Sequence, residues 1–209
     1  INYRDANGCC IKTPFGNIIL ISFALKYFLY YGTLWAIADS LKLNDQDAFD
    51  ALVISMRTML GYEAMDFEIE PRADVPGEIH QRVQILTDQQ LHFIIGHEYA
   101  HHYLGHLDGG KLLDFDSLAG VHQQLGRLKI YNYSQQNELD ADFHAIHNLD
   151  TPDDTKGVLL EAATTFFFIL DIYFCFKDAM DPHVGNYHSH PKPVDRIWEL
   201  RRKFAETIG

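Results

Sequence analysis

Residues 94–106, IIGHEYAHHYLGH, constrain the fold more than any other part of the chain. The segment holds four of the twelve histidines and a glutamate among apolar residues. His97, Glu98 and His101 form the pattern H-E-x-x-H, and positions i and i+4 share one face of a helix. Both imidazoles can therefore reach one metal ion, while Glu98 can reach a water beside that ion. The alternative is a core helix with polar edges and no metal.

A third ligand has to come from another part of the chain, because a catalytic zinc site keeps three protein ligands and one open position. The longer pattern H-E-x-x-H-x-x-G-x-x-H requires Gly and His at positions 104 and 107, and both positions are Leu. His106 is one position out of register with that pattern. We expect His106 to point away from the ligand face.

Glu138 and Asp142 are the better candidates for the rest of the site. They stand four residues apart in a segment that we expect to be helical, so they share a face. Glu138 would bind the metal, and Asp142 would accept the outer N–H of a ligating histidine and so fix its tautomer. A solvated acidic helix face explains this pair when it is taken alone, and the neighbouring H-E-x-x-H pattern favours the metal site.

Three short blocks, in order over about residues 85–200, resemble the gluzincin metallopeptidases. The similarity is to the branch with the CAAX-prenyl endopeptidase, the bacterial heat-shock protease HtpX and the small minigluzincins. The first block is H-E-x-x-H, and the second is E-x-x-x-D-x-x-A at Glu138, Asp142 and Ala145. The third is SHPKPVDRI at residues 189–197, which resembles the [ST]-H-P-x-x-x-x-R-[IL] segment of that branch.

This resemblance implies a role for each matching residue. Glu98 would be the general base and acid, and His190 and Arg196 would lie near the metal. His190 would stabilise the tetrahedral intermediate or act as a switch that occupies the open site. Arg196 would act there or would only anchor its helix on a carboxylate. The implied zinc ligands are His97, His101 and Glu138.

Composition limits the other classes of function. The 209-residue chain is 47% hydrophobic and carries a net charge of −12, so it predicts a folded domain that does not bind nucleic acid. The basic residues near the C-terminus, such as Arg201, Arg202 and Lys203, are typical of a solvated helix face. Three cysteines, two of them adjacent, indicate a reducing compartment, and we expect a cytoplasmic protein.

The pattern of apolar residues predicts one α+β domain over residues 1–209, mostly α-helical, with a zincin-like active-site helix and a small sheet. Residues 1–85 would form a helical part with a sheet edge, and residues 86–209 the catalytic core. MDFEIE at 65–70 alternates apolar and acidic residues, which predicts a strand. By the resemblance, that strand would be the edge that binds substrate. We expect one long helix or a pair of helices over about 18–42, and further helices over Asn44–Leu60, Thr87–Leu107, from Gln135, 155–178 and 194–207. Asn44 would cap the second of these segments, and Thr87 and Gln90 have the spacing of a capping box at the start of the third.

The run from Ile18 to Ala36 is long enough to span a bilayer and carries one charge, Lys26. Its tyrosines and its lysine favour a buried core helix, and membrane association stays an alternative. A second apolar run, 158–176, contains two acidic residues and favours a core helix more strongly.

These observations predict a zinc-dependent endopeptidase that acts on a protein or peptide substrate. Three alternatives remain open: a metal-binding sensor or binding module without catalysis, a helical interaction domain without a metal, and a membrane-anchored protease.

Overall fold

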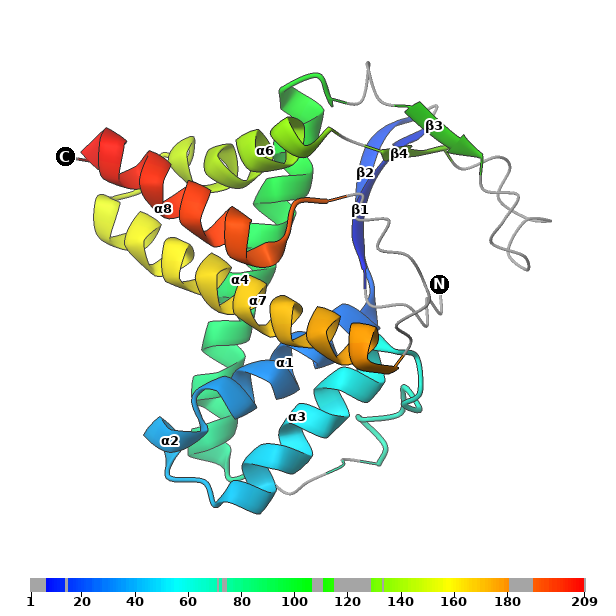
Figure 1. Cartoon of the computed structure of the whole chain (residues 1–209), viewed down its shortest axis with the longest axis vertical. Coiled ribbons are helices and arrows are strands. Elements are labelled where there is room, and N and C mark those ends of the chain that lie inside the picture. The colour runs from blue at the N-terminus through cyan, green and yellow to red at the C-terminus, as the bar shows by residue number, and fades with distance from the viewer. Residues whose placement is uncertain are drawn as a thin grey trace.

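The computed structural model describes residues 7–13, 15–70, 72, 75–106, 111–114, 129–132, 134–180 and 190–208. In these ranges the chain forms seven helices and two antiparallel two-stranded sheets, which confirms the mostly helical α+β class (Figure 1). The elements are β1 (Gly8–Thr13), β2 (Gly16–Ile21), α1 (Phe23–Ala36), α2 (Ala38–Leu41), α3 (Asp45–Met59), α4 (Gly77–Tyr103), β3 (Lys111–Asp114), β4 (Lys129–Asn132), α6 (Gln135–His147), α7 (Asp153–Met180) and α8 (Pro193–Ile208).

β1 and β2 form a hairpin, and β2 occupies residues 16–21, where the sequence predicted the start of a helix. Gly16, the first residue of β2, has a φ of 124°, which would strain a residue with a side chain. The three isoleucines of β2 are β-branched and suit a strand. The helix begins only after Ser22, whose Oγ accepts the N–H of Leu25 at 3.1 Å.

The two apolar runs of the sequence, 18–36 and 158–176, form helices of different lengths. α1 takes only 14 residues of the first run, fewer than the roughly 20 that span a bilayer, and it buries Phe28 and Leu29 completely. Among the described helices, α7 is the one long and apolar enough to cross a membrane, judged by length and composition alone. Only 33% of its most apolar stretch is buried, and Phe168 on its outer side is exposed.

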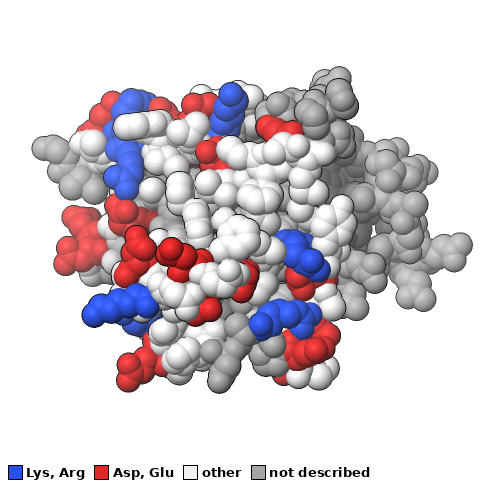
Figure 2. All heavy atoms as spheres, turned by 60° about the horizontal axis from the view of Figure 1, so that its bottom comes forward, with Lys and Arg blue, Asp and Glu red and all other residues white. Residues whose placement is uncertain are grey.

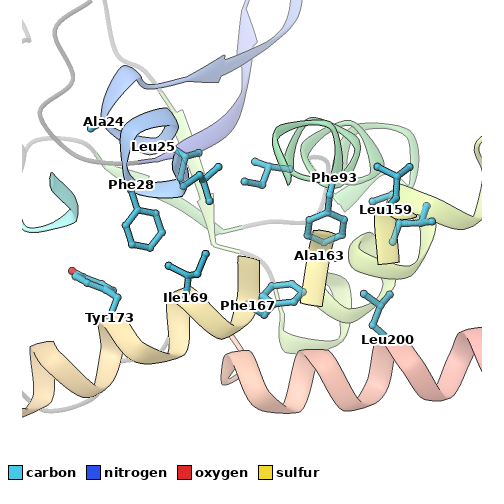
Figure 3. Packing of buried hydrophobic residues seen from close by; sticks show 14 of the residues in the cluster. Ala24, Leu25, Phe28, Phe93, Leu159, Ala163, Phe167, Ile169, Tyr173 and Leu200 are labelled. Atoms are coloured by element: carbon cyan, nitrogen blue, oxygen red, sulfur yellow. The ribbon is translucent and has the colours of Figure 1, made fainter. Parts of the chain in front are cut away.

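The largest cluster of buried hydrophobic residues lies where α7 crosses α1, α4 and α8 (Figure 3). Phe28 from α1, Phe93 from α4 and Phe167 from α7 are fully or almost fully buried. The Phe93 and Phe167 rings meet edge to face, with centroids 5.5 Å apart. This cluster fixes the position of α4 relative to α7, and α4 carries the H-E-x-x-H residues.

α3 has the boundaries that the sequence predicts. Asn44 caps it by accepting the N–H of Asp47 on its side-chain oxygen at 2.9 Å. Gly61, just beyond the helix, has a φ of 73°, which is the left-handed conformation of a C-terminal cap.

The strand predicted at residues 65–70 is wrong, because the chain forms turns there. The Asp66 carbonyl accepts the N–H groups of both Ile69 and Glu70 at 2.8 Å. Arg72 binds the Asp66 carboxylate and the Ala64 carbonyl, which holds the turn in place. The substrate-binding edge expected at 65–70 is therefore not a strand.

The predicted start of the H-E-x-x-H helix at Thr87 is also wrong. α4 begins earlier, at Gly77 after Pro76, and runs unbroken for 27 residues to Tyr103. Thr87 is completely buried, and Gln90 donates a hydrogen bond from Nε2 to Thr33 Oγ1 of α1 at 2.8 Å. Thr87 and Gln90 have the T-x-x-Q spacing of a capping box, but both lie inside α4 and are buried, and Gln90 bonds to α1.

Charged side chains of both signs are interspersed on the face shown in Figure 2. The basic residues of α8 also pair with acidic neighbours: Arg201 with Glu161 at 3.0 Å, and Lys203 with Asp140 at 2.9 Å. These pairs agree with a solvated helix face for the C-terminal basic residues.

Candidate metal centre

The upper end of α4 packs against α6, and α8 packs on α6 and α7 (Figure 1). The approach of α4 to α6 depends on small residues. A Cβ at Gly96 would lie 2.9 Å from the carbonyl oxygen of Ala145, so glycine allows a spacing that a larger residue would prevent. α6 begins at a defined residue, since Ser134 Oγ accepts the N–H of Asn137 at 3.2 Å. Glu138 therefore lies in the first turn, facing α4.

His97, His101 and Glu138 form a buried group whose ligand atoms all lie within 4.8 Å of one another. The two Nε2 atoms are 3.0 Å apart. Glu138 Oε2 lies 3.5 Å from His97 Nε2, and Glu138 Oε1 lies 3.4 Å from His101 Nε2. Bonds of about 2.0–2.2 Å to a tetrahedral ion separate neighbouring ligand atoms by about 3.3–3.6 Å. These residues could therefore hold a metal ion with little rearrangement.

The chemistry of the donor atoms fits the same conclusion. Glu138 is completely buried, and within the described residues neither of its carboxylate oxygens has a hydrogen-bond partner of good geometry. Burial destabilises a carboxylate, and a cation bound to it would compensate this cost in addition to the histidine contacts around Glu138. Two imidazoles and one carboxylate are a common ligand set of catalytic zinc.

The second carboxylate of α6 supports the first histidine. Asp142 Oδ1 lies 2.9 Å from His97 Nδ1, the ring nitrogen that faces away from the ligand group. Arg196 of α8 donates to both oxygens of Asp142, at 2.8 and 2.6 Å. Its guanidinium also lies 4.4 Å from the centre of the Phe167 ring. Arg196 therefore anchors on the Asp142 carboxylate, and its Nη2 also lies 3.6 Å from Glu138 Oε2, so both alternatives that the sequence left open remain.

The charges of the site change the protonation of its members. Burial alone would lower the pKa of His97, but Asp142 and Glu138 outweigh it and raise that pKa to about 10. Burial, assisted by the charge on His97, lowers the pKa of His101 to about 2. The pKa of Glu138 is lowered, because the His190 and His97 contacts outweigh its burial. Without a metal ion, the extra proton on His97 makes this ring positively charged and offsets part of the negative charge of Glu138 and Asp142.

Glu98 follows His97 on α4 and is half-buried. Burial and the charge of Glu138 raise the pKa of Glu98, although the nearby His97 opposes this. The backbone N–H of Cys10 in β1 donates to the Glu98 carboxylate. Strand β1 therefore lies beside the residue that the sequence predicts as the general base.

His190 lies at the entrance to the group. Its Nδ1 is 2.8 Å from Glu138 Oε2, and its side chain is 55% exposed. The histidine predicted to act near the metal thus contacts one of the candidate ligands from the solvent side. His183 and His188, which the sequence assigns to the same loop, lie outside the described residues.

His106 is not part of the ligand group, but it makes a contact with His101 that the sequence did not predict. Its ring lies beside His101, with the two Nδ1 atoms 3.0 Å apart. α4 ends at Tyr103, and Gly105 has a φ of 74°, so the chain reverses and brings His106 back over the helix end. The prediction assumed that the helix continued to Leu107, and Gly105 was the feature that could have corrected it.

The chain matches no family model, no curated protein and no solved structure. The arrangement of the site residues therefore carries the functional argument.

Proposed function

We propose that this chain is a zinc-dependent endopeptidase that hydrolyses peptide bonds of a protein or peptide substrate. The proposal rests on one observation: a buried group of two imidazoles and one carboxylate with Glu98 beside it in the sequence of α4. The three ordered blocks that resemble gluzincin metallopeptidases support the assignment. A purely structural zinc site usually has four protein ligands and no need of a neighbouring carboxylate.

In this proposal His97, His101 and Glu138 hold the zinc ion. The chemistry that bound zinc supplies is Lewis acidity, which lowers the pKa of water and polarises a peptide carbonyl. Glu98 accepts the proton of the attacking water and donates it to the leaving amine. The raised pKa of Glu98, caused by burial and by Glu138, brings this carboxyl closer to the range where it can do both.

The remaining polar residues keep these groups in place. Asp142 would accept a hydrogen bond from the Nδ1–H of His97, so that the proton stays on Nδ1 and Nε2 presents its lone pair to the ion. Arg196 holds Asp142 by two hydrogen bonds and fixes the orientation of that carboxylate. His190 is available from the solvent side to donate a hydrogen bond to the substrate oxygen as its negative charge develops.

A second candidate is a metal-binding domain without catalytic turnover, in which His190 closes the site. The observation that favours it is the 2.8 Å contact between His190 Nδ1 and Glu138 Oε2. In the first candidate the His190 ring donates a hydrogen bond to the substrate, and in the second it closes the metal site. One set of variants distinguishes these two functions.

The test is peptide hydrolysis by the zinc-loaded protein, measured on a library of quenched fluorescent peptides. The variants are Glu98→Gln, which keeps the ligands, and His190→Ala, which opens the site. Hydrolysis by the wild type or by His190→Ala that falls about 10²–10⁴-fold with Glu98→Gln, at equal zinc content, supports the endopeptidase. Equal hydrolysis with and without Glu98 contradicts it. Zinc binding without hydrolysis in any variant favours the binding domain.

A further inference from the structure

His106 lies outside the roles assigned above, and its position depends on a specific turn. α4 ends with the Leu104 N–H bound to the Ala100 carbonyl and the Gly105 N–H bound to the His102 carbonyl. The left-handed conformation of Gly105 then turns the chain back. The ring centroids of His101 and His106 are 5.1 Å apart, with planes inclined by 63°. A residue five positions on in a continuous helix would face away from His101.

The two nitrogens of His101 have different surroundings. Its Nε2 lies 3.0 Å from His97 Nε2 and 3.4 Å from Glu138 Oε1, inside the ligand group. Its Nδ1 lies 3.0 Å from Nδ1 of His106, outside that group. The atom that would bind the ion and the atom that meets His106 are therefore opposite nitrogens of one ring.

A neutral imidazole carries one proton, and the hydrogen bond at one nitrogen decides which nitrogen keeps its lone pair. A proton on His101 Nδ1, donated to Nδ1 of His106, leaves the lone pair on Nε2, where the ligand group needs it. The opposite arrangement, with His106 donating, would put the proton of His101 on Nε2 and block ligation. Metal binding therefore requires His106 to act as the acceptor.

The two ligating histidines thus receive different support. His97 Nδ1 faces a carboxylate that Arg196 holds, while His101 Nδ1 faces an imidazole. Both partners lie on the side of the ring away from the ligand group, although one comes from α6 and the other from the turn after α4.

We propose that His106 is a positioning residue that accepts the Nδ1–H of His101 and so keeps His101 Nε2 available to the metal. This inference rests on the metal site of the proposed function, and it deepens that site by assigning the residue that sets the tautomer of the second histidine. It needs no contact between His106 and the ion or the substrate.

The test uses four variants of the full chain. His106→Ala and His106→Phe remove the acceptor, and Phe keeps a ring of similar size. His106→Gln restores an acceptor through its amide oxygen. His102→Ala is the matched control, because His102 is an exposed histidine of the same segment. Far-ultraviolet circular dichroism establishes that each variant is folded.

Two readouts are measured. The first is zinc affinity by competition with a chromophoric chelator. We expect it to fall about 10–100-fold in His106→Ala and His106→Phe, and to stay near the wild-type value in His106→Gln and His102→Ala. The second is the tautomer of His101, read from long-range ¹H–¹⁵N correlation spectra without added metal. We expect an Nδ1–H signature for His101 in the wild type and in His106→Gln, and its loss in His106→Ala.

Equal affinity and an unchanged His101 signature in His106→Ala would overturn the positioning role. Because the tautomer is read without metal, the failure of the metal site itself is distinguishable. Suppose that the wild-type chain binds no zinc, and that the Nδ1–H signature of His101 is lost in His106→Ala. This result would support the role of His106 and contradict the proposed enzyme.

Discussion

The two halves of α4 perform different tasks within one unbroken helix. The first half, residues 77–90, faces α1 with completely buried Val83 and with the neutral hydrogen bond from Gln90 to Thr33. The second half carries His97 and His101 and faces α6 with its two carboxylates. The first half is a packing element, and the second is a platform for ligands. Ligands on a rigid helix keep their spacing better than ligands on a loop.

The energetic consequence is that the two halves differ in what they contribute to stability. Buried apolar surface stabilises the fold in the first half and around Phe93. The second half brings Glu138, Asp142 and Arg196 into a buried network, and buried charges contribute little net stability even when they are paired. An ion bound there would add stability that the protein groups alone do not provide.

The largest effect on stability is expected from a substitution in the hydrophobic core that packs against α4. Phe28→Ala removes a completely buried ring of α1 and leaves a cavity. We expect the free energy of unfolding to fall by about 3–5 kcal/mol, with unchanged zinc per folded chain. Urea denaturation and metal analysis of the folded fraction measure the two quantities. A loss of zinc from protein that is still folded would show that metal binding depends on the packing around Phe28.

The next largest effect is expected on zinc affinity, from Asp142→Asn beside the metal ligand His97. The amide keeps the volume of the carboxylate but loses its charge, so it orients His97 less well and leaves Arg196 without its ion pair. Zinc affinity should fall about 10–100-fold, as measured by chelator competition. The matched control is Asp150→Asn, because Asp150 is an exposed residue just beyond the end of α6. Equal affinity in Asp142→Asn and the wild type would contradict the role of Asp142.

An effect of similar size is expected from pH. The carboxylates raise the pKa of His97 to about 10, against the lowering effect of burial, so near pH 7 the metal-free site holds a proton that zinc must displace. Zinc affinity should therefore rise about tenfold for each pH unit between about 7 and 9 from this group alone. Titration calorimetry in buffers of different ionisation enthalpy counts the released protons. Release of no proton would mean that His97 is already neutral.

The smallest effect is expected from Gln90→Leu in the first half of α4. This change replaces a neutral hydrogen bond to Thr33 by apolar surface, and we expect stability to change by about 1 kcal/mol or less. Zinc affinity should be the same as in the wild type. A change in affinity greater than the error of the chelator assay would show that packing in the first half controls the geometry of the second.

The sequence was sufficient for features that depend on local chemistry. Asn44 caps α3 as predicted, and α6 begins at Gln135. The spacing of four residues places His97 and His101 on one shared face of α4. These features follow from helix geometry and from capping hydrogen bonds, and neither requires knowledge of the tertiary structure.

The sequence was insufficient where tertiary contacts override a local pattern. Residues 65–70 alternate like a strand, but Arg72 binds the turn that they form. Thr87 and Gln90 have the spacing of a capping box, but they lie between α4 and α1. The position of His106 depends on the left-handed conformation of Gly105. Because the helix was predicted to run to Leu107 and not to end at Tyr103, the contact between His106 and His101 was not predicted.

The most direct test of the central claim is the metal content of the purified chain, measured by elemental mass spectrometry. Three variants accompany the wild type: His97→Ala and Glu138→Ala, which each remove a ligand, and Glu98→Gln, which keeps all three. We predict about one zinc ion per chain in the wild type and in Glu98→Gln, and much less in the two ligand variants. A wild type without zinc after purification with sufficient metal would contradict the account, and His97 and His101 would then be polar residues of a core helix.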